Sequence, residues 1–346
     1  MHDYPRDTLH RGLVLRFDPG QGGRVNRLWA RGTAAVASAK AAPLVDFRTD
    51  ARPAPLGQDF LETVDELKFK QDWYRACRKA AQVKPLDFVG RFSPAMPAET
   101  IAADIRRMLG LTDEEVYQQD AAEALYSCLA NKAGDVGILV FRNEFVGNDE
   151  NRKLSVAEFR GVAICDPHVP AIFINGADAP AAWAVTLAHE MALIWLGASG
   201  ISDASPFSQN QQARLCNEVA GELLVPRQPF LALWDSVQDN DEGKLTFVRS
   251  HIRVSALMIA RRALELGRVR AGFYRSIYQR TCQAGLKSGS GGDFHRAIQV
   301  RNGKAFSKLV ASMAMRGAIS LRDAADLLDA DPANVLCYAK QQALSP

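Results

Sequence analysis

Three short apolar runs sit in the middle of a chain whose other apolar residues recur at helical spacing, and this mixture constrains the fold most strongly. Gly, Asn, Asp or Pro bounds each run, and a polar stretch (147–153) connects the first two. Bounded apolar runs of this length are typical of buried strands. The runs are VGILVF (136–141), FRGVAIC (159–165) and AIFI (171–174). We therefore predict an α+β fold with a small sheet of about three strands in a mostly helical chain.

Helix-end signals frame the flanking segments. Pro97 fits the first turn of a helix that Gly110 ends, and Asp178 and Gly197 frame an apolar helix in the same way. Pro226 ends the next helix. On these signals we predict helices over 97–109, 112–132, 178–196 and 209–225.

Composition excludes several classes of protein. The formal net charge is only +3, which argues against a nucleic-acid or membrane coat over the whole surface. No run of 18 uncharged apolar residues occurs, and the first residues do not form a secretory signal, so we expect no membrane span. The six cysteines are scattered without a Cys-x-x-Cys pair. Reduced thiols and a cytoplasmic location are the expectation.

His189 and Glu190 lie together in the apolar helix, in the segment TLAHEMALIWLG. Zinc peptidases use His-Glu-x-x-His on a helix, because histidines four residues apart lie on one face and reach one metal. The intervening Glu then serves as general base. Here Leu193 stands at the fourth position, so spacing alone favours an ordinary buried histidine.

The surrounding residues resemble the ImmA/IrrE family of metallo-endopeptidases. The resemblance is carried by 158–203, which contains His189-Glu190, and by CNEVAGELLVP (216–226). Weaker similarity covers roughly 60–340, in PLDFVG (85–90), AADIRRMLGL (102–111), VSALMIARRALELG (254–267) and GGDFHRAIQVRNGKAF (291–306). The resemblance implies a small zincin-like peptidase core, a short sheet plus the His-Glu helix.

The resemblance also implies a zinc site, with a third, acidic ligand four residues before an Asn of the next helix. His189 matches the first ligand and Glu190 the general base, whereas Leu193 replaces the second His. Counting back from Asn217, the third position is Ala213. Two of three ligands are thus absent, so we expect zinc to be absent or weakly bound. A leucine suits a packed interior, so we also expect Leu193 to be buried.

Neighbouring residues do not restore the ligand set. At about 100° per residue, Glu218 lies roughly 140° around the helix from Ala213, and Glu222 on the opposite side. Asn217 lies only about 40° away, but amides are poor zinc ligands. His168, in the loop between two predicted strands, is a remote candidate.

We interpret the chain as four regions. Residues 1–59 form a basic, poorly ordered extension, with nine Lys/Arg and five Asp/Glu in residues 1–55. Residues 60–132 are helical, 133–230 form the metallopeptidase-like core, and 231–346 form a helical C-terminal region. The last contains a helix-turn-helix-like segment, 244–267, with the turn at Val254-Ser255. Its basic residues, which could contact phosphates, are Arg249, His251, Arg253, Arg261 and Arg262.

Two functions follow from different classes. The first is a pseudopeptidase that binds a regulatory protein, such as the helix-turn-helix repressors or antitoxins that the family cuts in stress responses and toxin-antitoxin systems. The partner would add as a strand to an edge formed by 159–165 or 171–174. The alternative is an active zinc endopeptidase with an unusual ligand set, in which Glu190 is the base and His189 one ligand. Nucleic-acid binding is disfavoured.

Overall fold

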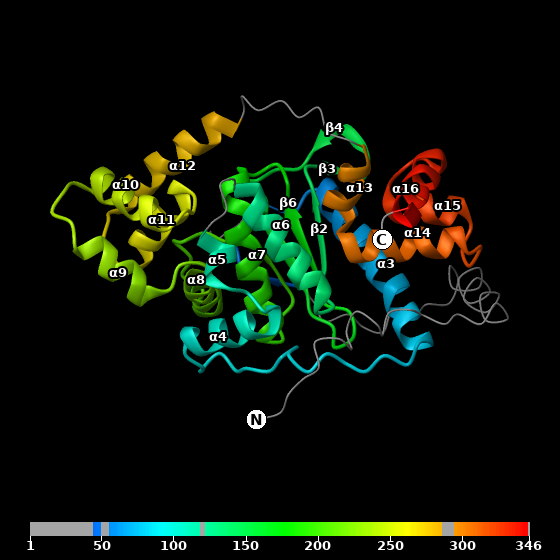
Figure 1. The fold of residues 1–346 in the computed structure, drawn as a ribbon, viewed down its shortest axis with the longest axis horizontal. Coiled ribbons are helices and arrows are strands. Elements are labelled where there is room, and N and C mark those ends of the chain that lie inside the picture. The colour runs from blue at the N-terminus through cyan, green and yellow to red at the C-terminus, as the bar shows by residue number, and fades with distance from the viewer. Residues whose placement is uncertain (1–43, 50–54, 118–121, 286–293, 345–346) are drawn as a thin grey trace.

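The computed structural model describes residues 44–49, 55–117, 122–285 and 294–344 (Figure 1). At its centre is a five-stranded mixed sheet with the strand order β1-β7-β5-β6-β2. β5 runs antiparallel to both of its neighbours, whereas β1 is parallel to β7 and β2 is parallel to β6. The strands are β1 (Val45–Asp46), β2 (Leu139–Asn143), β5 (Gly161–Ile164), β6 (Ala171–Asn175) and β7 (Gly200–Ser202).

The three predicted strands are confirmed as β2, β5 and β6, but the sheet has two more. β1 and β7 are two and three residues long, which is too short for an apolar alternation to stand out in the sequence. A separate antiparallel hairpin pairs β3 (Phe145–Val146) with β4 (Asp149–Lys153), and β4 lies within the predicted polar connection 147–153.

Both faces of the sheet are buried. Val140, Ala163 and Ile172 point into one hydrophobic cluster, whereas their neighbours Phe141 and Val162 point into another. Burial on two faces explains why these strands are continuous apolar runs rather than alternating ones.

Nine helices of the described residues contribute to the hydrophobic cluster on the first face. They include the His-Glu helix α7 and its neighbour α8, and α9–α12 lie farther out (Figure 1). Their bounds are α4 (Ala98–Leu109), α5 (Asp113–Tyr117), α6 (Ala122–Asp135), α7 (Pro180–Trp195), α8 (Gln211–Leu224), α9 (Arg227–Asp235), α10 (Asp241–His251), α11 (Ala256–Glu265) and α12 (Ala271–Gly285).

The second face is covered from both ends of the chain. α3 lies between β1 and β2 in sequence, whereas α13–α16 follow the last strand. Phe306 of α14 stacks edge-on against both Trp73 of α3 and Phe141 of β2. The bounds are α3 (Gln58–Ala80), α13 (Phe294–Asn302), α14 (Lys304–Met315), α15 (Leu321–Leu328) and α16 (Pro332–Leu344).

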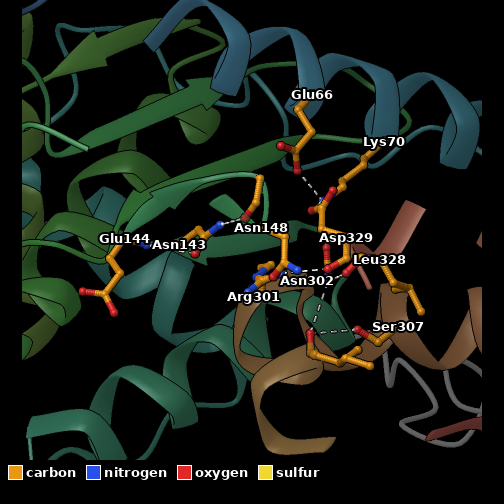
Figure 2. A network of polar contacts seen from close by, with 12 residues as sticks. Glu66, Lys70, Asn143, Glu144, Asn148, Arg301, Asn302, Ser307, Leu328 and Asp329 are labelled. Atoms are coloured by element: carbon orange, nitrogen blue, oxygen red, sulfur yellow. Dashed lines mark hydrogen bonds and ion pairs between the residues drawn. The ribbon is translucent and has the colours of Figure 1, made fainter. Parts of the chain in front are cut away.

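A buried lysine joins the two ends on this face (Figure 2). Lys70 of α3 donates to Glu66 one turn earlier at 2.6 Å, to the amide oxygen of Asn302 at 2.8 Å, and to the carboxylate of Asp329 after α15. Asn302 in turn donates to the carbonyl of Leu328 at 2.9 Å. α3 is thereby tied to the C-terminal helices by ionic and polar contacts as well as by the core.

The predicted ends at Gly110 and Pro226 are confirmed, but Pro97 is the N-cap of α4 rather than a residue of its first turn. The helix predicted over 112–132 is described as α5 and α6, with residues 118–121 outside the described residues. Gly110 ends α4 in the left-handed conformation at φ 57°, and Pro226 follows the end of α8. Asp178, however, is not the N-cap of α7: Ala179 takes that position without a side-chain cap. The Asp178 carboxylate instead accepts a hydrogen bond from Tyr278 at 2.9 Å, and its second oxygen lies 3.5 Å from Nε of Arg160.

The structure describes parts of two of the predicted regions, the N-terminal extension and the helix-turn-helix-like segment. Most of the predicted extension, residues 1–43 and 50–54, lies outside the described residues, but its residues 45–46 form β1. The helix-turn-helix-like segment is formed by α10 and α11, and Ser255 caps α11 by accepting from the Met258 amide at 3.2 Å.

Within the described residues, none of the helices combines the length and the apolar character that a membrane crossing requires.

Candidate functional site

α7 places His189 and Glu190 in the interior between the sheet and α8. The helix is apolar around its whole circumference, and its residues from Ala181 to Trp195 are buried. A helix of that kind must be surrounded by other elements. His189 and Glu190 differ by about 100° around the axis, so they contact different neighbours.

His189 contacts α8. Its Nδ1 lies 2.8 Å from Oδ1 of Asn217, whose Nδ2 donates to the carbonyl of Ser205 at 2.7 Å. The same Oδ1 accepts a hydrogen bond from Nη2 of Arg261 on α11, also at 2.8 Å. Because Asn217 presents an oxygen to both groups, the imidazole carries its proton on Nδ1 and a lone pair on Nε2.

Burial and a nearby cation keep this imidazole neutral. Desolvation is the main cause that lowers the pKa of His189, to about 4, and the positive charge of Arg261 acts in the same direction. Nε2 is buried and contacts no hydrogen-bonding group of the described residues.

Glu190 faces the sheet. Its Oε1 accepts a hydrogen bond from the hydroxyl of Ser202 on β7. It lies so close to Gly161 of β5 that a Cβ at that position would be 2.4 Å from Oε1. Burial raises the pKa of Glu190 to about 8, although the Ser202 hydrogen bond opposes the shift. Oε2 is buried without a hydrogen-bonding partner among the described residues.

The two predicted ligand positions hold packed apolar groups. Leu193 has no exposed surface and Ala213 is 2% exposed, and both belong to the core on the first face of the sheet. The expectation that Leu193 is buried is confirmed. Neither side chain carries an atom that could bind a metal.

Other candidate ligands are engaged or chemically unsuited. Glu222 pairs with Arg262 of α11, and the thiol of Cys216 has a pKa well above its ordinary value because it is buried. His168 is the exception: it lies in the loop between β5 and β6, and its Nδ1 is buried without a hydrogen-bonding partner among the described residues. Within the described residues, no group of three or more His, Cys, Asp or Glu side chains could hold a metal ion.

Arg261 adds an electrostatic obstacle. It is 6% exposed, and it donates to the carbonyl of Ala204 at 2.6 Å and to Glu265 at 2.9 Å in addition to Asn217. A guanidinium held beside the imidazole opposes the approach of a dication. With one histidine, two apolar residues and this cation, the site does not fit zinc, which needs about three protein ligands in a catalytic site.

Sequence reasoning did not identify the roles of Asn217 and Arg261. The sequence indicates that Asn217 is a poor ligand, whereas the structure shows that it orients the histidine through a hydrogen bond. The predicted phosphate contacts Arg261 and Arg262 are instead buried against carboxylates of α8 and α11. The signal available was their position in the apolar run ALMIARRALE, which indicates that the helix face carrying them is buried.

The structure also corrects the predicted docking edges. β5 pairs with β6 and β7, and β6 pairs with β2 and β5, so both are interior strands without a free edge. The edges of the sheet are β1 and β2. The unpredicted strand β7 covers one side of β5, and the predicted strand β2 covers one side of β6.

The α+β fold, with a short mixed sheet beside a buried His-Glu helix, is consistent with a zincin-like peptidase domain. Residues 133–264 match the family model described as the IrrE N-terminal-like domain, a peptidase family. The matched range is narrower than the 60–340 covered by the resemblance. Neither the curated proteins nor the solved structures provided a match.

Proposed function

We propose that this chain is a pseudopeptidase, which keeps the IrrE-like peptidase fold but regulates a protein partner by binding it. The observation that carries the proposal is the environment of His189. Its predicted co-ligand positions are the buried Leu193 and Ala213, and the cation of Arg261 shares Asn217 with it. The partner class we propose is a helix-turn-helix repressor or antitoxin, as the family resemblance implies, and the location is cytoplasmic.

One observation favours the alternative, an active zinc endopeptidase with a different ligand set. Nε2 of His189 is a buried lone pair, and Asn217 binds the opposite ring nitrogen. Metal-ligating histidines are oriented in the same manner, by a hydrogen bond at the second nitrogen. The two functions differ in whether peptide hydrolysis depends on Glu190.

The test compares the wild-type chain with Glu190→Gln in the native cells. Glutamine keeps an oxygen that can accept from Ser202, so the variant should fold. For a binding role, the same full-length helix-turn-helix proteins should co-purify with both chains, and peptide mass spectrometry should find no new termini in them. Fragments that appear with the wild type and disappear with Glu190→Gln would instead establish the peptidase.

A further inference from the structure

The two edges of the sheet are covered very differently. At the β2 edge, α13 packs along the strand (Figure 1), and a Cβ on Gly303 between α13 and α14 would be 2.7 Å from the carbonyl oxygen of Val140. At the other edge, the side of β7 that faces away from β5 is covered by the short strand β1. We call residues 44–49, which contain β1, the edge segment.

The edge segment pairs with β7 in parallel through its main chain and inserts the side chain of Phe47 beside it. The amide of Val45 donates to the carbonyl of Ser199 at 3.0 Å, and that of Phe47 to Ile201 at 2.9 Å. Phe47 is 2% exposed, whereas Val45 is 48% exposed. A Cβ on Gly200 would be 2.3 Å from the Phe47 ring, so this glycine forms a slot for the aromatic side chain.

Asp203, immediately after β7, binds the far end of the edge segment. It accepts from the amide of Thr49 at 2.9 Å and from its hydroxyl at 3.0 Å. The next two residues, Ala204 and Ser205, present the carbonyls that Arg261 and Asn217 bind. The edge is therefore continuous with the loop that positions His189.

These features match how proteins bind extended peptides: exposed main-chain groups supply affinity, and a side-chain slot supplies specificity. We propose that the outer edge of β7 is a docking edge for an extended peptide with an aromatic side chain followed two residues later by a hydroxyl-bearing residue. The edge segment is its resident competitor. The pairing covers only two residues, so the attachment rests largely on the side chains of Phe47, Arg48 and Thr49, and a peptide in trans that carries the same side chains can replace the edge segment.

The proposal goes beyond the proposed function and does not depend on zinc, because its readout is peptide binding alone. The probe is a fluorescent peptide with the sequence LVDFRT, which copies residues 44–49, measured by anisotropy against the full-length chain. Phe47→Ala removes the chain's own aromatic ring from the slot beside Gly200. Thr49→Val removes the hydroxyl contact with Asp203 and leaves Phe47 in its slot. This second variant also weakens the edge segment, and it replaces Phe47→Ala if loss of Phe47 impairs folding.

The opened variants should bind the probe more tightly than the wild type, about tenfold for Phe47→Ala, because apparent affinity scales with the fraction of chains whose edge is open. Val45→Ala, an exposed side chain of the same strand, should match the wild type. Adding Gly200→Ala to Phe47→Ala should abolish binding by filling the slot. The proposal is overturned if both opened variants melt cooperatively yet bind no better than the wild type, or if the Gly200→Ala double variant still binds.

Discussion

Glu190 and Gly161 show how a single missing Cβ shapes the site. The carboxylate occupies the space in which a side chain on β5 would lie, and Ser202 fixes it there. This arrangement was not predictable from the sequence, because helical spacing tells which face a residue is on but not which strand it meets. By contrast, Leu193 was predictably buried, because its own side chain already favours a packed interior.

Gly161→Ala should destabilise the chain by about 1–3 kcal/mol, the usual range for overpacking a core. In a Glu190→Ala background, the same change should cost less than about 1 kcal/mol, because the clashing carboxylate is gone. Urea denaturation of the four chains measures both values. Gly272→Ala is the matched control, since a Cβ there meets nothing within 4 Å. Equal costs in the two backgrounds would show that Glu190 does not occupy that space.

At the scale of elements, helices with local end signals were predictable from the sequence. Strands that form only by pairing with distant strands were not. The helix from 98 to 109 was predictable, since Gly110 adopts the left-handed conformation that ends it. β7 was not, because three residues become a strand only through the neighbours that they pair with. The burial of Arg261 and Arg262 likewise depends on the carboxylates that α8 and α11 bring to them.

The contact of α3 with Asp329 predicts a pH dependence. Glu66 and Asp329 both face Lys70, and Arg301 adds a second cation near Asp329. Burial raises the pKa of Glu66 to about 7 from its ordinary value near 4.5. A raised carboxyl pKa means that the folded chain binds more protons than the unfolded one, so this contribution to stability is lost as pH rises from about 4.5 through 7.

Glu66→Gln should therefore gain stability relative to the wild type between pH 5 and pH 8, as followed by melting temperature. Glu62→Gln, one turn earlier on α3, is the control of opposite sign. Arg152 lowers the pKa of Glu62, so that variant should lose stability relative to the wild type above pH 5. A stability difference between Glu66→Gln and wild type that stays constant with pH would contradict the assignment.

At the scale of the whole molecule, the family match and the structural unit have different boundaries. The matched range 133–264 includes four of the five strands of the central sheet. The second face of this sheet, however, is covered by α3 and α13–α16, which lie outside the range. Phe141 and Phe173 would be exposed in the isolated range.

A fragment of residues 133–264 should accordingly fail to fold alone. It should bind a dye specific for exposed apolar surface and lack a cooperative thermal transition, whereas the full chain should show the reverse. A cooperative melt of the fragment with little dye binding would contradict this prediction, because it would show that the fragment folds without α3 and α13–α16.

The central claim is that the site around His189 does not hold zinc because two ligand positions are vacated. Leu193→His with Ala213→Glu restores both side chains that the resemblance implies, and three ligands should then hold the metal far more tightly than the single changes together.

Elemental analysis of the purified chains after zinc exposure and gel filtration tests this claim most directly. The account predicts no stoichiometric zinc in the wild type and about one zinc per chain in the double variant. One tightly held zinc in the wild type that is lost on His189→Ala would contradict it, and an empty double variant would contradict Ala213 as the third position.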